Sequence, residues 1–129
     1  LKHAHHATDV DQSGTDSFRH RTAGAAEVVL ASPNRVAIMQ ELRGAAEPSL
    51  TELLARMRPV DLILIEGFKR EPHPKIEAHR TEAGKPLIAP DDPTIRAVAS
   101  DTPLTLDRPV FDLDDTKGVA DFIAAELGL

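Results

Sequence analysis

At 129 residues the chain is long enough for one globular domain, and its 41% hydrophobic and 28% charged residues are ordinary for a folded soluble protein. A formal net charge of −6 disfavours non-specific binding to nucleic acid or to an anionic membrane. The absence of cysteine excludes disulfides and thiolate metal sites and fits a reducing cytoplasm. No apolar run approaches the roughly 18 residues that span a bilayer, and the polar, histidine-rich start differs from a signal peptide.

The first 21 residues, LKHAHHATDVDQSGTDSFRHR, hold four of the six histidines. His3, His5 and His6 could ligate zinc or nickel, with a neighbouring aspartate completing the set. Because H-x-H-H is not a specific metal spacing, we favour partly solvated loop side chains. A metal-binding protein that uses this His/Asp segment remains an alternative.

The same segment also resembles the first half of a calcium loop. Asp9, Asp11, Ser13 and Gly14 fit the pattern D-x-D-x-S-G. Such a loop needs a bidentate glutamate at its twelfth position, which is His20 here. An EF-hand is therefore rejected.

Three elements are predicted in the first half of the chain. Thr15 or Asp16 can cap a short helix over residues 17–23. Two β-prone runs joined by Ser-Pro-Asn predict a hairpin over residues 27–42. Ser49, with a glutamate three residues later, matches a capping box and predicts a helix over residues 50–57.

Residues 62–65 are Leu-Ile-Leu-Ile, without alternation, which predicts a strand buried on both faces as in a parallel sheet. Glu66 and Gly67 follow at the carboxyl end of this strand, where open α/β sheets bind ligands. A carboxylate there can hold Mg²⁺ beside a nucleotide, and Lys69 could reach a phosphate. The alternative is a surface salt bridge.

Downstream, residues 75–79 predict a more exposed strand, residues 83–93 a loop and residues 95–100 a buried strand. A helix over residues 116–127 ends the chain, with one apolar face. Strands interleaved with helices indicate an α/β class, and the hairpin makes the sheet mixed, though mostly parallel.

A Mg²⁺-nucleotide site also needs a phosphate cradle of backbone N–H groups. The motif G-x-x-x-x-G-K-[ST] does not occur, and the one Gly-Lys pair, Gly84-Lys85, is followed by Pro86. The 129 residues thus predict a metal-holding strand without a phosphate loop.

Four stretches together resemble the MobB family of P-loop GTP-binding accessory proteins: KHAHHATDVDQSGTDSFRHRTAGA, VVLASPNRVAIMQEL, DLILIEGFKREPHPKIEAHR and IRAVASD. The resemblance covers nearly the whole chain. It implies a P-loop NTPase-like fold whose first strand, phosphate loop and first helix would precede Leu1. We therefore expect residues 1–129 to form a single, N-terminally incomplete domain. Its uncovered strands, residues 62–65 and 95–98, should favour association, and alone it should bind GTP poorly and be inactive.

The resemblance further implies a cytoplasmic homodimer that binds GTP with Mg²⁺ and is a weak GTPase. It would assist the molybdopterin guanylyltransferase and other proteins of molybdenum cofactor assembly. The alternative is a dimeric, non-enzymatic scaffold that has lost its nucleotide site. The exposed edge of the hairpin favours pairing with a second copy.

Carried over to this chain, the family pattern makes Glu66 the catalytic and Mg²⁺-holding carboxylate. Asp9 and Asp11 would approach the metal from the loop after the second strand. Ser100 and Asp101 would meet the guanine base, where Asp101 could accept two N–H hydrogen bonds. Lys2 and Lys69 are candidate phosphate or partner contacts, with solvated lysines as the alternative.

Overall fold

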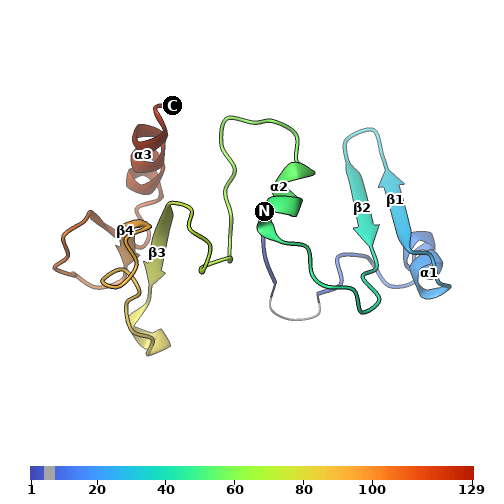
Figure 1. Cartoon of the computed structure of the whole chain (residues 1–129), viewed down its shortest axis with the longest axis horizontal. Coiled ribbons are helices and arrows are strands. Elements are labelled where there is room, and N and C mark those ends of the chain that lie inside the picture. Colours follow the sequence, from blue (N-terminus) through green and yellow to red (C-terminus); the bar gives the residue numbers. More distant parts are fainter. Residues whose placement is uncertain (5–7) are drawn as a thin grey trace. The chain divides into compact units, whose positions relative to one another are not determined.

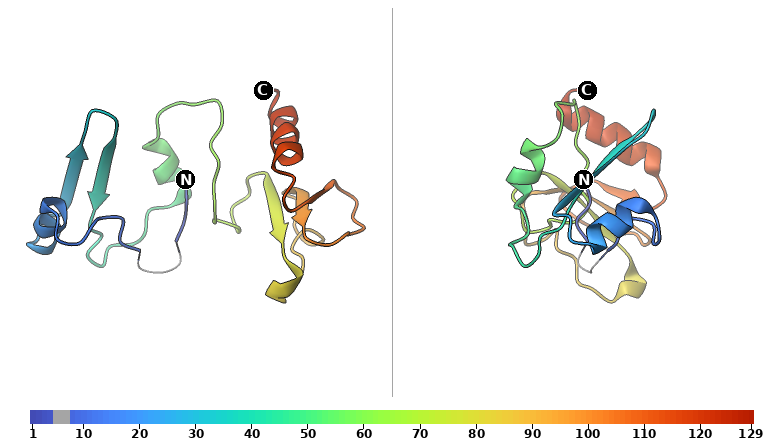
Figure 2. Two further views of the ribbon diagram at one scale, coloured as in Figure 1. Left: turned by 180° about the vertical axis from the view of Figure 1, so that it is seen from behind. Right: turned by 90° about the vertical axis from the view of Figure 1, so that its right-hand side faces the viewer.

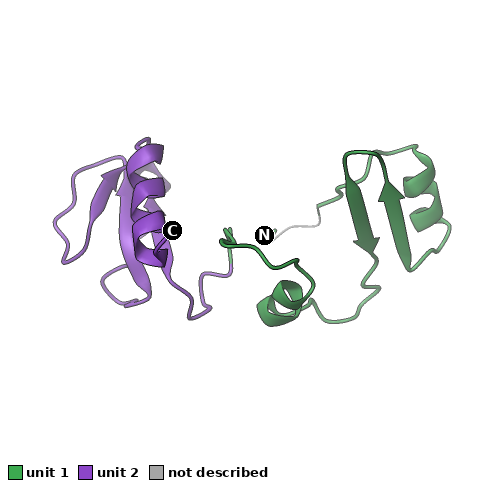
Figure 3. Ribbon diagram, turned by 90° about the horizontal axis from the view of Figure 1, so that it is seen from above, with its two compact units in different colours: residues 1–67 green, residues 68–129 purple. Residues whose placement is uncertain are grey.

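The computed structural model describes residues 1–4 and 8–129, which form two compact units, Leu1–Gly67 and Phe68–Leu129 (Figures 1 and 3). Each unit has its own short elements. The single domain expected over residues 1–129 stays a prediction.

In unit 1, helix α1 spans Asp16–Thr22 and begins at the N-cap Thr15, whose hydroxyl oxygen accepts a hydrogen bond from the Phe18 N–H. Strands β1 (Glu27–Ala31) and β2 (Val36–Gln40) pair antiparallel. Helix α1 lies beside the open end of this hairpin (Figure 2). The predicted short helix and the predicted hairpin are both confirmed.

Helix α2 spans Leu50–Ala55 and has the predicted capping box. The Ser49 side chain accepts a hydrogen bond from the Glu52 N–H, and the Glu52 carboxylate accepts one from the Ser49 N–H. Leu50, the first helical residue, is buried at 8% exposure. The helix ends two residues before the predicted bound.

The buried strand predicted over residues 62–65 is wrong. In the described part of the chain, residues 62–65 form no strand, the following Glu66 makes an isolated parallel bridge with Lys2, and Leu64 is 64% exposed. Among the described residues, its recorded backbone partners are residues 1–3, on one edge. An apolar run is buried as a strand only where neighbours cover its edges and faces, and composition alone does not supply them.

Unit 2 contains a three-stranded parallel sheet in the order β3-β4-β5. Strands β3 (Lys75–His79) and β4 (Ile95–Ser100) have the predicted bounds, whereas β5 (Val110–Asp112) was not predicted. A three-residue strand is too short to show a periodic pattern. The 3₁₀ helix η1 (Thr81–Ala83) follows β3, and helix α3 (Thr116–Leu127) closes the chain.

The core of unit 2 surrounds β4. Ala89, Ile95 and Val98 form a buried cluster, and Leu87, Leu104 and Leu106 pack against it. Ala97 also has no exposed surface. Strand β3 pairs with β4 along one edge and β5 pairs with residues 98–100 on the other, and the apolar residues of 95–98 are buried. The expectation that residues 95–98 would be uncovered is therefore wrong.

The α/β class and the mostly parallel pairing are confirmed, but the hairpin forms a sheet of its own and does not join the parallel one. Helix α3, at 12 residues, is the longest helix described. Across residues 1–4 and 8–129, no helix combines the length and apolar character needed to cross a membrane.

Candidate functional site

Lys2 and Glu66 lie side by side on neighbouring extended segments. The His3 N–H donates to the Glu66 carbonyl oxygen and the Glu66 N–H to the Leu1 carbonyl oxygen, each at 2.8 Å. Lys2 Nζ lies 2.9 Å from Glu66 Oε1, and the two side chains are 68% and 70% exposed. This opposite-charge pair is open to solvent, so a ligand could bind either group without displacing packed atoms.

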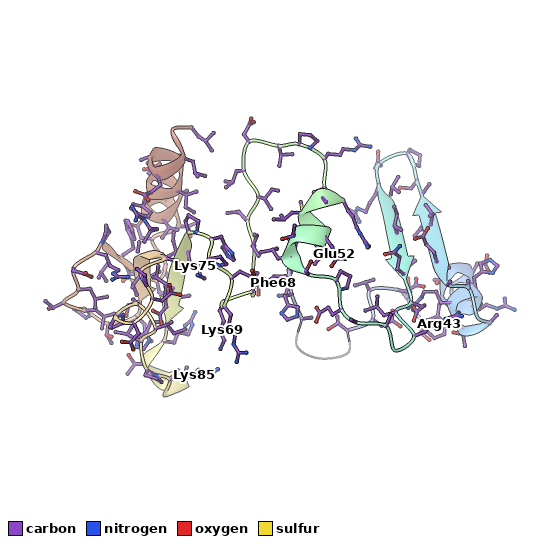
Figure 4. All side chains as sticks on the ribbon, viewed as in Figure 1. Arg43, Glu52, Phe68, Lys69, Lys75 and Lys85 are labelled. Carbon is purple, nitrogen blue, oxygen red and sulfur yellow. The ribbon has the colours of Figure 1, made fainter. Side chains whose placement is uncertain are left out.

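The chain turns sharply after Glu66. Gly67 has φ +93° and Phe68 has φ +49°, a left-handed conformation that non-glycine residues rarely adopt. Lys69 lies in the turn that follows, which the Glu71 N–H closes by donating to the Phe68 carbonyl oxygen at 3.0 Å (Figure 4). Lys69 is exposed.

Asp9 and Asp11, both predicted metal ligands, are bound to the Arg21 guanidinium. Arg21 Nη2 lies 2.7 and 2.8 Å from the two Asp9 carboxylate oxygens, and Nε lies 3.1 Å from Asp11 Oδ2. Nη1 donates to Glu41 Oε1 at 2.8 Å. One guanidinium from α1 thus neutralises carboxylates from the preceding loop and from the end of the hairpin. A metal ion could bind Asp9 and Asp11 only after displacing Arg21.

The Asp11 carboxylate is the most enclosed group of this cluster, with a side chain 6% exposed. Its Oδ1 also accepts a hydrogen bond from Ser17 Oγ at 2.8 Å. The backbone N–H of Asp11 donates to Asp9 Oδ1 at 3.0 Å, and this bond, followed by those from Arg21, holds the pKa of Asp9 below its usual value. The same carboxylates raise the pKa of Arg21, Asp9 foremost.

At the carboxyl edge of the unit 2 sheet, Asp101 accepts hydrogen bonds from Thr81. The Thr81 N–H lies 3.1 Å from Asp101 Oδ1 and 3.2 Å from Oδ2, and Thr81 Oγ1 lies 3.0 Å from Oδ1. The Thr81 N–H is the main cause of a lowered pKa at Asp101. Ser100 is buried at 3% exposure, and its Oγ accepts a bond from the Thr102 N–H at 3.1 Å. Asp101 therefore joins the turn after β3 to the end of β4.

His3 is the one member of the histidine cluster within the described residues, since His5 and His6 lie outside them. Its Nε2 lies 2.8 Å from Glu47 Oε1, and its side chain is 18% exposed. In the described part of the chain, no three His, Cys, Asp or Glu side chains are grouped so that they could hold a metal ion. The histidine metal site stays a prediction.

Sequence reasoning missed three residues that organise these sites, namely Arg21, Glu47 and Thr81. Arg21 is 10 positions from Asp11 and Glu47 is 44 positions from His3, so no short motif shows these contacts. One signal was available for Arg21. Two aspartates next to a capped helix need a nearby cation, and the helix carries arginines at its end.

Comparison with known proteins adds family information to this geometry. Residues 1–101 match the family described as molybdopterin guanine dinucleotide synthesis protein B, MobB. The chain is 45% identical over 126 residues to the molybdopterin-guanine dinucleotide biosynthesis adapter protein of Escherichia coli K12, covering 95% of this chain and 72% of that protein. The protein of the same name from Haemophilus influenzae is 43% identical over 126 residues, with coverage of 95% and 68%.

Solved structures show the same similarity. A crystal structure of molybdopterin-guanine biosynthesis protein B (mobB) superposes with a TM-score of 0.68 at 25% identity, covering 86% of this chain and 74% of that one. A MobB homolog from Bacillus stearothermophilus superposes with a TM-score of 0.62 at 26% identity, with coverage of 81% and 72%.

Proposed function

Because the chain belongs to the MobB family, we propose that it acts as an adapter in the biosynthesis of molybdopterin guanine dinucleotide, the guanylylated form of the molybdenum cofactor. The observation that carries this proposal is the 45% identity to an adapter protein over 95% of the chain. Its partners would be the molybdopterin guanylyltransferase and other cofactor assembly proteins, and its setting the cytoplasm. A role centred on metal binding by His3 has less support, because Glu47 binds its Nε2.

The proposed nucleotide site is centred on Lys2 and Glu66. Mg²⁺ keeps several of its waters and is commonly held by one or two carboxylates together with substrate phosphates. The exposed Glu66 carboxylate fits this need, and Lys2, 2.9 Å away, fits a phosphate oxygen. Bound Mg²⁺ would offset charge on the GTP phosphates. Lys2 and Glu66 of unit 1 would orient the phosphate and the metal. Lys69, which belongs to unit 2, is a separate candidate for a phosphate contact.

In unit 2, considered by itself, Ser100 and Asp101 at the carboxyl end of β4 are the proposed guanine contacts, as the family resemblance implies. The three bonds from Thr81 occupy most of the roughly four lone-pair positions of the Asp101 carboxylate, which leaves about one for a guanine N–H unless Thr81 moves away. Asp9 and Asp11 contribute less to the proposed site than Glu66, because Arg21 holds them.

The experiment that tests the adapter role measures formation of the dinucleotide. Molybdopterin, MgGTP and the guanylyltransferase are combined with and without the chain, and the expected result is a higher yield with it. The variant Glu66→Gln keeps the size of the side chain but removes its charge, so it should weaken Mg²⁺-dependent GTP binding. An exposed carboxylate changed in the same way, Asp61→Asn, is the control.

The outcomes separate the candidate functions. Since the 129 residues contain no phosphate-loop motif, GTP binding by this chain should be weak, and fusing a Walker A segment ahead of it should strengthen that binding. Stimulation of the transferase by a chain that does not bind GTP would favour the scaffold. No stimulation and no contact with the transferase would contradict the adapter role.

The hairpin carries the proposed homodimer contact. Pairing of Val29 with Ile38 and of Ala31 with Val36 places their side chains on one face. Val29, Val36 and Ile38 are 56%, 62% and 64% exposed. Clustered exposed aliphatic residues mark association surfaces, and a second copy of the hairpin would cover them symmetrically.

A further inference from the structure

The sequence singled out His3 as a metal ligand, but its contacts suggest a different task. Its imidazole Nε2 bonds to Glu47 Oε1 at 2.8 Å, and its backbone N–H donates to the Glu66 carbonyl oxygen at 2.8 Å. The side chain is 18% exposed, whereas the neighbouring Lys2 side chain is 68% exposed. His3 therefore joins the loop before α2 to the segment that contains Glu66.

Gly67 makes room for His3. A Cβ atom added to Gly67 would lie 2.8 Å from the His3 Cβ and 3.4 Å from its carbonyl oxygen. The first distance is shorter than non-bonded carbon atoms tolerate. The absence of a side chain at Gly67 thus lets His3 lie directly against the backbone after Glu66. The close approach is a second constraint on residue 67, besides its φ of +93°.

We propose that His3 is a positioning residue for the Lys2–Glu66 pair, with Glu47 as its anchor. This inference rests on the proposed function, in which that pair holds the phosphate and the Mg²⁺ of a nucleotide. Lys2 and Glu66 cannot fix their own geometry, because an ion pair between two exposed side chains contributes little. The His3 side chain, at 18% exposure, is the enclosed group beside this exposed pair.

Glu47 stabilises a backbone pairing that is only a few residues long. Residues 1–3 make a short parallel ladder with residues 64–66, and short ladders open readily. A side-chain bond from a separate loop opposes that opening. When it is removed, the Lys2 ammonium should spend less time beside the Glu66 carboxylate.

The experiment is residue-specific amide exchange on the whole 129-residue chain. The N–H groups of His3 and Glu66 donate across the ladder, so their exchange rates report its opening. Wild type is compared with His3→Ala, Glu47→Ala and Glu47→Gln. The last variant keeps a side-chain oxygen that can accept a hydrogen bond from the His3 imidazole Nε2. His20→Ala, at an exposed histidine of α1, is the matched control. The Val98 N–H, which donates to the Pro109 carbonyl oxygen in unit 2, monitors general destabilisation.

We expect His3→Ala and Glu47→Ala to speed exchange at the two ladder amides by about tenfold. Glu47→Gln should restore most of the protection, and Val98 should be unaffected in every variant. Unchanged ladder exchange in Glu47→Ala would overturn the proposal, as would an equal rise at Val98 or in His20→Ala. If His3→Ala does not fold, Glu47→Ala decides, because its side chain is 59% exposed: faster ladder exchange supports the anchor, and exchange equal to that of wild type overturns it.

Titration of MgGTP into the same variants separates this inference from the proposed function. If wild type does not bind MgGTP, the nucleotide part of the proposed function fails, and amide exchange still decides whether His3 positions the pair. If MgGTP binds and His3→Ala abolishes binding with ladder exchange unchanged, positioning is overturned in favour of direct contact.

Discussion

Strand β4 of unit 2 and the hairpin of unit 1 are both rich in aliphatic residues, yet they differ in burial. Val98 has no exposed surface, whereas Val29 is 56% and Ile38 is 64% exposed. Strand β4 has a partner strand on each edge, but within residues 1–4 and 8–129 each hairpin strand is paired only with the other. Neighbours on edges and faces, more than composition, decide whether a valine contributes to a core.

Unit 1 relies more on polar contacts. The Arg21 side chain is 14% exposed and joins carboxylates from the loop before α1 and from the residue after β2. Unit 2 has one comparably enclosed ion pair, Lys75 with Asp92, whose side chains are 12% and 23% exposed, but it also buries the apolar cluster around Val98. Substitutions should therefore separate a unit stabilised by apolar burial from one stabilised by a charge cluster.

The largest effect is expected from Val98→Asp. An unpaired carboxylate in the apolar centre of unit 2 should lower the free energy of unfolding by about 4 kcal/mol. Urea unfolding monitored in unit 2 measures it. The control is Val60→Asp, at a valine that is 59% exposed, which should change stability by less than about 0.5 kcal/mol. Equal losses in the two variants would contradict the assignment of the core.

The second effect tests whether the exposed hairpin face is an interface. Ile38→Asp places a charge in the proposed contact with a second copy, so the dimer dissociation constant should rise roughly 30-fold, equivalent to about 2 kcal/mol. Sedimentation over a concentration series measures the constant. Leu30→Asp is the matched control, because Leu30 pairs with Ala37 on the opposite face and is 54% exposed. A stronger effect of Leu30→Asp would assign the interface to the other face.

The third effect concerns Arg21. Arg21→Ala leaves three carboxylates without their common cation, so unit 1 should melt about 5 °C lower. Thermal unfolding followed by NMR signals of α1 measures the shift. Arg19→Ala is the control, since the Arg19 side chain is 76% exposed and its Asp16 contact spans 3.9 Å. If the two variants melt at the same temperature, the charge cluster does not stabilise unit 1.

The bounds of an element could be predicted from the sequence where its pattern is local, and its burial could not. Strands β3 and β4 and helix α3 have the bounds that their local patterns predict, because each pattern is complete within the element. Residues 62–65 carry an equally apolar pattern, but their burial depends on strands elsewhere in the chain. The pattern alone could not tell the two cases apart.

For the candidate site, the sequence identified the charged residues but not their partners. Glu66 was placed at the end of an extended segment, as the structure has it, and the alternative of a salt bridge describes its contact with Lys2. The family resemblance assigned Asp9 and Asp11 to a metal, and no short motif pointed to Arg21, ten residues from Asp11, as their partner. Contacts between side chains at irregular separations need coordinates.

The smallest effect is a pH dependence that differs between the units. The folded-state pKa values of Asp9 in unit 1 and Asp101 in unit 2 lie below the usual 3.8, because the Asp11 and Thr81 N–H groups bond to the charged carboxylates. A carboxyl group with a lowered folded pKa stabilises the fold above its unfolded pKa, and this contribution is lost as the pH falls through the folded value. Stability should thus be constant down to about pH 5 and decline below about pH 4.

Asp9→Asn and Asp101→Asn assign this decline to the two units. Each substitution removes one titrating group, so Asp9→Asn should flatten the acid decline of unit 1 alone and Asp101→Asn that of unit 2 alone. The difference between wild type and variant should be about 2 °C in melting temperature between pH 5 and pH 3. Melting curves of NMR signals from α1 and from β4 give the two slopes. If Asp9→Asn left the pH dependence of the unit 1 melting temperature unchanged, the acid stability of unit 1 would depend on carboxylates other than Asp9. A flatter pH dependence of unit 2 in the same variant would contradict the assignment of Asp9 to unit 1 alone.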